Sequence, residues 1–174
     1  SLFGSNLSPI NKATSEIPLP TALGESCLTV NGVAVPMIYV SAAQINAQLP
    51  YQVDGNTTMI LRTPGGVSDN YNLRILPAAP RIFMNGTAGP LTGIPAVIRV
   101  KNGELVTASN PIRRNDSIVI YLAGMGNTVP AIEAGYPAPD DPVPTVVIPP
   151  VVELAGVELS VEFAGLVPGQ VGVY

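Results

Sequence analysis

The sequence predicts an all-β protein in which sheets pack face to face as sandwiches. Short runs that alternate apolar and polar residues recur along the chain, at the spacing of about 8–12 residues that is typical of such folds. The 17 glycines and 19 prolines supply frequent turns between these runs. No segment has the apolar period of about 3.6 residues, with capping residues, that indicates an α-helix. With 47% hydrophobic residues among 174, the chain can fill a core.

The first part of the chain contains a series of predicted strands. Two of them flank Asn31-Gly32, a dipeptide that suits a tight hairpin because both residues tolerate a positive φ. Asp54-Gly55 marks another turn, and residues 6–22 are polar and proline-bearing, which predicts a loop. The strands are expected at Ser26–Val30, Ala34–Val40, Gln44–Leu49, Thr57–Arg62 and Tyr71–Leu76.

The second part follows the proline-containing segment Pro77–Pro80. Ala96–Val100 and Glu104–Thr107 flank Asn102-Gly103 and predict a small hairpin, and Ser117–Leu122 predicts a buried strand. The remaining expected elements are an extended segment with six prolines at Gly135–Pro150 and a hairpin of Val151–Leu154 and Val157–Phe163 that turns at Ala155-Gly156.

An internal repeat predicts how these strands are divided. Residues 1–80 are expected to form a first β-sandwich, 81–115 a linker with a short hairpin, and 116–174 a second β-sandwich. The repeat rests on three matched pairs, which are Phe3–Leu7 with Tyr121–Met125, Val30–Val33 with Leu154–Val157, and Ile38–Ser41 with Glu162–Gly165.

Composition argues against several classes of function. The 12 acidic and 8 basic residues give a net charge of −4, and the only adjacent basic pair is Arg113-Arg114, so a nucleic-acid partner is not expected. No apolar run approaches the ~20 residues of a membrane span. The single cysteine, Cys27, cannot form a disulfide within the chain. A buried or half-buried thiol is the favoured interpretation of Cys27, and an intermolecular disulfide is the alternative.

The sequence offers few candidate residues for catalysis or for metal binding. Histidine is absent, which removes the usual general base and a common metal ligand, and no serine lies in a Gly-x-Ser-x-Gly motif. Asp140 and Asp141, between prolines, are weak candidates for calcium, which needs about six to eight oxygen ligands. A solvated turn is the favoured interpretation. The sequence therefore predicts no enzyme activity and no cofactor.

One polar strip remains as a candidate binding surface. Gln44, Asn46 and Gln48 alternate with Ile45, Ala47 and Leu49, so the amides share one face of a strand that ends near Tyr51. A structural strand with its apolar face in the core is the favoured interpretation. A partner or glycan strip formed by Gln44, Asn46, Gln48 and Tyr51 is the alternative.

An ordered set of motifs resembles a known family of sequences. The motifs are Ser1–Leu7, Leu19–Gly24, Val30–Gly32, Tyr39–Pro50, Ala79–Phe83, Ala108–Pro111 and Phe163–Tyr174. They are similar to uncharacterised C-terminal modules of large secreted acidobacterial proteins, which in turn resemble immunoglobulin-like IPT/TIG domains. The resemblance implies two immunoglobulin-like β-sandwiches, an extracellular or cell-surface location and no catalytic residues.

The resemblance also suggests how the chain would function. Family members continue into another strand where this chain stops, so the second sandwich is expected to lack its last strand or strands, with an acceptor edge near Val171, Val173 and Tyr174. The favoured interpretation is that the sequence is cut short. The alternative is that another chain supplies the strand, and such strand donation would build a fibre. The expected function is a structural or adhesive module whose partners are further copies or domains of a parent protein. The alternative is a carbohydrate-binding accessory module.

Overall fold

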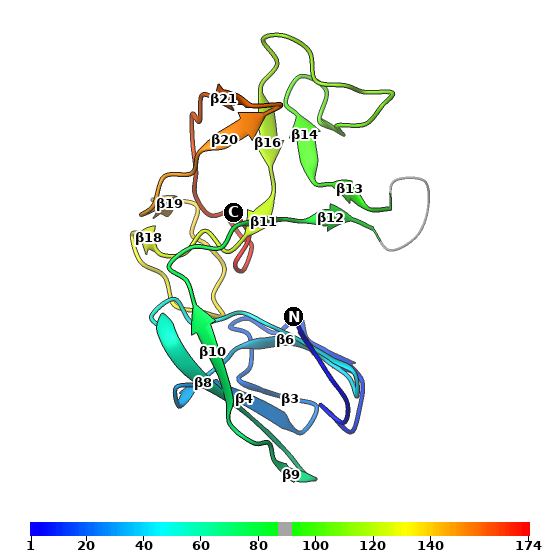
Figure 1. The fold of residues 1–174 in the computed structure, drawn as a ribbon, viewed down its shortest axis with the longest axis vertical. Coiled ribbons are helices and arrows are strands. Elements are labelled where there is room, and N and C mark those ends of the chain that lie inside the picture. The colour runs from blue at the N-terminus through cyan, green and yellow to red at the C-terminus, as the bar shows by residue number, and fades with distance from the viewer. Residues whose placement is uncertain (87–91) are drawn as a thin grey trace.

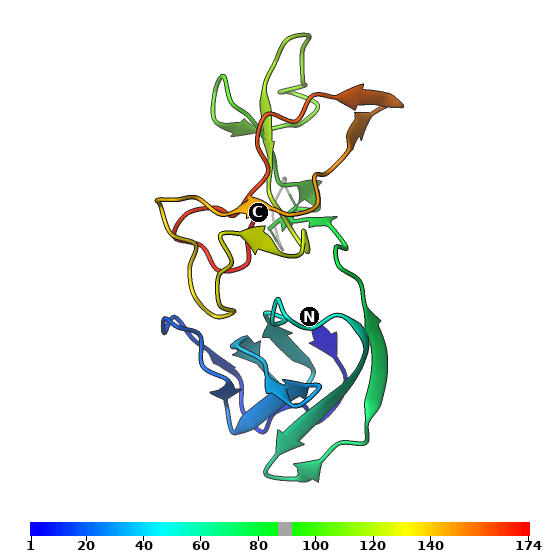
Figure 2. The same cartoon turned by 90° about the vertical axis from the view of Figure 1, so that its left-hand side faces the viewer.

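The computed structural model describes residues 1–86 and 92–174. All helical or extended secondary structure in these residues is β-strand (Figure 1). The predicted all-β fold is therefore confirmed, whereas its immunoglobulin-like topology stays a prediction. The strands fall into two halves that follow one another along the long axis of the molecule (Figures 1 and 2). Residues 1–76 form the first half, and the chain from Pro77 onward forms the second.

Two sheets build the first half. One has the strand order β1-β7-β6-β2, and the other has the order β10-β8-β4-β3, with β5 paired to β4 and β9 paired to β8. The strands are β1 (Leu2–Phe3), β2 (Lys12–Ala13), β3 (Ala22–Leu23), β4 (Ser26–Val30), β5 (Val33–Ala34), β6 (Met37–Val40), β7 (Gln44–Ala47), β8 (Gly55–Thr63), β9 (Gly66–Val67) and β10 (Tyr71–Ile75).

The two sheets meet in one well-filled core. Strand β4 alternates as the sequence predicts, with Leu28 and Val30 buried and Thr29 between them half-buried. Met37 and Ile45 contribute from the other sheet and are almost fully buried. Partly buried residues of β8 and β10 complete the cluster from the edge of the second sheet. Burial of this apolar surface is the main stabilising contribution to the first half.

The second half is divided into smaller sheets. Three strands form the sheet β15-β14-β16, and the other strands form pairs, β11-β17, β12-β13, β18-β19 and β20-β21. The strands are β11 (Arg81–Ile82), β12 (Met84–Asn85), β13 (Ile94–Pro95), β14 (Val97–Arg99), β15 (Glu104–Leu105), β16 (Ile118–Ile120), β17 (Leu122–Ala123), β18 (Thr128–Val129), β19 (Thr145–Val146), β20 (Val152–Leu154) and β21 (Val157–Leu159).

The hairpin that the sequence places in a linker belongs to this second half. Strand β14 pairs with β15 as expected, and it also pairs with β16, which brings Val97 opposite Ile120. Strand β11 pairs with β17 in the same way. The expected boundary between 115 and 116 therefore does not separate two units, because strands on either side of it share hydrogen bonds.

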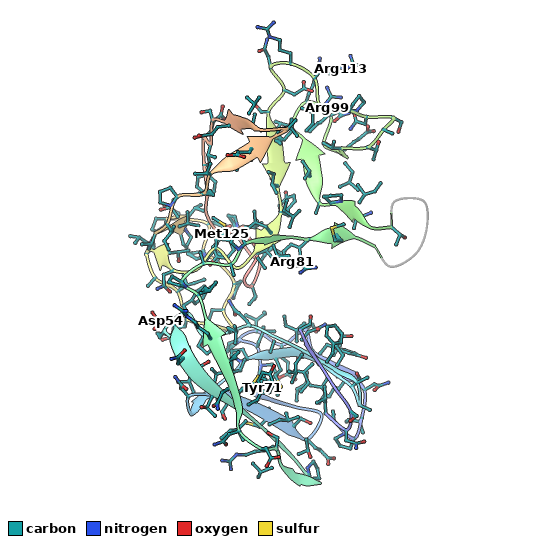
Figure 3. All side chains as sticks on the ribbon, in the orientation of Figure 1. Asp54, Tyr71, Arg81, Arg99, Arg113 and Met125 are labelled. Atoms are coloured by element: carbon teal, nitrogen blue, oxygen red, sulfur yellow. The ribbon has the colours of Figure 1, made fainter. Side chains whose placement is uncertain are left out.

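A buried arginine organises the far end of the second half, where Arg99 and Arg113 are labelled in Figure 3. Arg99 Nε and Nη2 lie 2.9 and 2.8 Å from Asp116 Oδ2, and its Nη1 donates to Asn110 Oδ1 at 2.7 Å. Asn110 in turn donates to the Leu105 carbonyl. The Arg113 backbone N–H, together with the nearby Arg99, holds the pKa of the Asp116 carboxyl below its ordinary value. This network satisfies its own polar groups, so we interpret it as structural.

The second half has a smaller buried core than the first. Among the described residues, its buried cluster consists of Met125, Ala138, Leu166 and Tyr174. The chain as a whole has 10788 Å² of accessible surface, whereas a compact monomer of its mass would expose about 8,000 Å². Two separate domains of half the mass would together expose about 9,700 Å². Division into two halves therefore accounts for only part of the excess, and roughly 1,100 Å² remains.

Candidate functional site

The predicted polar strip lies partly in the contact between the two halves. Gln48 Oε1 accepts a hydrogen bond from the Gly135 N–H at 2.6 Å, and Gln48 Nε2 donates to the Tyr51 hydroxyl at 3.0 Å. Gly172 packs against the same amide, since a Cβ added there would lie 3.1 Å from Gln48 Nε2. Both functional ends of the Gln48 side chain are thus occupied within the chain. We call the contact formed by Leu19, Gln48, Tyr51, Gly135 and Tyr174 the junction.

Gly135 ties a second segment of the first half into the junction. Its carbonyl accepts a hydrogen bond from the Leu19 N–H at 2.8 Å. Its φ of 89° lies in the left-handed region, and an added Cβ would lie 3.2 Å from Pro36. A side chain at position 135 would therefore be both strained and crowded. These contacts hold the first half against the Gly135 loop at two separate points, Leu19 and Gln48.

Two tyrosines from opposite halves complete the junction. The Tyr174 hydroxyl donates to the Gly126 carbonyl and interacts with the Tyr51 hydroxyl. Burial raises the pKa of both tyrosines above the ordinary value of 10.0, because the charged phenolate would lose its hydration. Tyr51 is therefore part of an internal polar cluster.

The rest of the predicted strip pairs with itself. Gln44 Nε2 donates to Asn46 Oδ1 at 2.7 Å, and both side chains are half-buried on β7. Ile45 is buried on the opposite face, as the alternation indicates. The structure thus favours the structural interpretation of this strand, and it places only Gln44 and Asn46 where a partner could reach them.

The other predicted site residues lie apart from one another. Tyr174 is 9% exposed, and its backbone N–H and carbonyl both bond to Leu122 at 2.9 Å. Val171 and Val173 are half-buried beside it. Cys27 is a free, half-buried thiol on β4. Strand β17 is therefore bordered by Tyr174 on one side and by β11 on the other.

The two aspartates proposed for calcium are exposed and have no third ligand. Asp140 and Asp141 lie in a bend between prolines. Throughout residues 1–86 and 92–174, no three side chains of the metal-binding types gather closely enough to hold an ion. The structure offers no geometry here from which a metal site could be argued.

The sequence predicts the hairpin β20–β21, but it did not indicate that the apolar face of this hairpin would be left open. Its register places Leu154 opposite Val157 and Glu153 opposite Glu158. The apolar face is left uncovered, with Leu154 48% and Val157 64% exposed. Like charges directly opposite each other destabilise an antiparallel pair. A basic residue on a neighbouring strand would therefore reduce the repulsion between Glu153 and Glu158. The repeat matches Val30–Val33 with Leu154–Val157, but among the described strands only the first hairpin has a further strand, β8, paired beside it.

Comparisons with protein-family models, with characterised proteins and with solved structures found no match to this chain. The family that the motifs resemble therefore stays a prediction. Among the described residues, the structure has no helix that is long and apolar enough to cross a membrane.

Tyr174→Phe is expected to destabilise the second half and to change its response to alkali. The variant leaves the Gly126 carbonyl without its donor, which costs about 1 kcal/mol of unfolding free energy. Because the pKa of Tyr174 in the folded state lies above 10.0, its hydroxyl loses the proton at a lower pH in the unfolded state than in the folded state. Stability from Tyr174 is thus fully present below pH 10.0 and is lost as the pH rises through the raised folded value.

Urea unfolding between pH 8 and pH 11 would measure this effect. We expect a steep loss of stability above pH 10 in the wild type and a shallower one in Tyr174→Phe. Tyr136→Phe serves as the control, because Tyr136 is exposed and contributes to no buried cluster. Parallel pH profiles for wild type and Tyr174→Phe would contradict the assignment.

Proposed function

We propose that the chain is a non-catalytic structural or adhesive module of an extracellular or cell-surface protein, and that it associates with further copies of itself by strand pairing. The observation that carries the proposal is the uncovered apolar surface of the second half. The chain exposes roughly 1,100 Å² more than two separate domains of half its 18.0 kDa would. A stable protein–protein contact buries about 800 Å² on each partner.

The distribution of that surface supports assembly more than the binding of a small ligand. Apolar side chains at 40–70% exposure line the second half from Val147 to Phe163. Exposed apolar side chains concentrated in one segment favour contact with another macromolecule. The carbohydrate-binding alternative follows from the family resemblance, and the amide strip is its candidate surface. Two of the four strip residues, Gln48 and Tyr51, bond within the junction.

The mass of the purified chain in solution tests this proposal. We expect light scattering over a dilution series to give masses above 18.0 kDa that fall on dilution. Negative-stain images of the same sample are expected to show elongated particles. A mass of 18.0 kDa at every concentration, with no assembled particles, would contradict self-association.

A further inference from the structure

The outer edge of β20 lacks the neighbour that the equivalent strand of the first half has. Both hairpins turn through two residues with positive φ, Asn31 and Gly32 at 48° and 78° and Ala155 and Gly156 at 51° and 81°. When the two hairpins are aligned at this turn, Glu153 on β20 takes the position of Thr29 on β4. Thr29 lies opposite Ile60 of β8. Within the described residues, β20 pairs only with β21, so nothing occupies the corresponding place.

The register of the hairpin shows which groups β20 leaves open. Leu154 and Val157 close the two-residue turn, so their backbone groups bond to each other. The backbone N–H and carbonyl of Glu153 must then point outward, because bonding direction alternates along an antiparallel strand. Val152 and Leu154 share the apolar face, and the Glu153 side chain lies on the other face.

Strand β10 offers a complementary open edge in the first half. On β8, the Thr58 carbonyl accepts a hydrogen bond at 2.9 Å from the Asn31 N–H, on the side of β4. Thr58 lies opposite Asn72 of β10. The backbone groups of Asn72 therefore point away from β8, and so do those of Arg74 two residues later. Among the described strands, β10 pairs only with β8. Its side chains alternate like those of β20, with Leu73 turned inward and the charged Arg74 exposed.

The two edges fit in a single antiparallel register. Glu153 opposite Arg74 joins two residues whose backbone groups both point outward, and it places opposite charges side by side. The same register sets Leu154 against Leu73 and Val152 against Ile75 on the apolar face. It also brings together the exposed side chains of Val151 and Leu76, which are 70% and 52% exposed. Arg74 has no ion-pair partner among the described residues, whose only salt bridge joins Arg99 to Asp116.

We infer that the outer edge of β20 is the docking site for the β10 edge of a second copy of this chain, with Glu153 opposite Arg74. This inference rests on the proposed self-association and specifies its contact. The second copy is the occupant because one chain carries both surfaces, in different halves: β20 lies in the upper half of Figure 1, and Tyr71 marks β10 in the lower half of Figure 3. A contact between different surfaces leaves one donor and one acceptor edge open in every dimer. Assembly therefore continues into a filament unless the rotation closes a ring.

Disulfide trapping tests the register directly. Arg74→Cys and Glu153→Cys would each be made in a Cys27→Ser chain, mixed and oxidised. In this register, residues 74 and 153 form a hydrogen-bonded antiparallel pair. The Cα atoms of such a pair are about 5.5 Å apart, which suits a disulfide. We expect a covalent dimer of twice 18.0 kDa on a non-reducing gel. Arg74→Cys mixed with Glu158→Cys is the control, since Glu158 lies on the far strand of the hairpin, and no such dimer is expected from it.

Charge reversal tests the same contact without a new bond. Glu153→Arg or Arg74→Glu alone is expected to weaken assembly about tenfold, because like charges then face each other. The double variant restores the attraction and is expected to assemble like the wild type. Glu162→Arg and Arg62→Glu are matched controls, because both residues are exposed and neither lies in the register. We expect these controls to assemble normally.

The outcomes separate this inference from the proposed function. Specific cross-linking of residues 74 and 153, with rescue by the double variant, supports the register. If the chain assembles in light scattering but residues 74 and 153 do not cross-link, or cross-link no better than 74 and 158, the register is overturned and self-association stands. A chain that stays monomeric at every concentration overturns both.

Discussion

Gly126→Ala is expected to lower the unfolding free energy of the second half by about 3–5 kcal/mol. Gly126 has a φ of 83°, a conformation that side chains with a Cβ rarely adopt. An added Cβ would also lie 2.0 Å from the Pro77 carbonyl oxygen, which is backbone and cannot rotate away. The Gly126 carbonyl accepts the Tyr174 hydroxyl, so any shift of this segment also disturbs the junction. Urea unfolding followed by circular dichroism would measure the loss.

Gly103→Ala is the matched control for this variant. Gly103 also lies in the second half with a positive φ, 69°, but an added Cβ would meet nothing within 4 Å. The control therefore reports backbone strain alone, at about 1–2 kcal/mol. Equal losses in the two variants would show that the close approach to Pro77 contributes nothing.

Met37→Ala is expected to lower the unfolding free energy of the first half by about 2–5 kcal/mol. Met37 is 0% exposed in the core between the two sheets, so its removal leaves a cavity that the surrounding residues only partly fill. The position also receives a backbone hydrogen bond, since the Met37 N–H donates to the Pro20 carbonyl at 2.8 Å. Alanine keeps that bond, and the loss therefore measures packing alone.

Ile38→Ala provides the comparison on the same strand. Ile38, the next residue of β6, is 39% exposed and lies where the pairing of β6 with β7 is irregular. Its truncation is expected to change the unfolding free energy by less than about 1 kcal/mol. A large loss from Ile38→Ala with little from Met37→Ala would contradict the burial of Met37 in the core.

The elements that sequence predicts well are those whose pattern and turn agree. Val30 and Val33 flank a turn whose two residues adopt the positive φ expected of Asn-Gly, and Leu154 and Val157 flank an equivalent turn. In both places the register follows from the turn length. Local chemistry decides these hairpins, so the sequence is sufficient to predict them.

Pairing between distant strands is decided by packing and was not predictable in the same way. The β14–β15 hairpin was expected, but its second partner, β16, joins Arg99 to Ile118 across a long loop. Nothing in the alternation of a short strand identifies which edge it will meet. The same limit applies to the candidate site. Gln48 has a partner 87 residues away, Gly135, and no local pattern marks that contact.

The junction also has a consequence for the order of events during synthesis. All strands of the first half, including β10, have been made before Pro77 leaves the ribosome. The first half can therefore complete its core while the remaining residues are still being added, as N-terminal domains commonly do. The later half, with its small core, then meets a surface that already presents Leu19, Gln48 and Tyr51. We expect the nascent chain to become protease-resistant in two stages, the earlier one ending with β10.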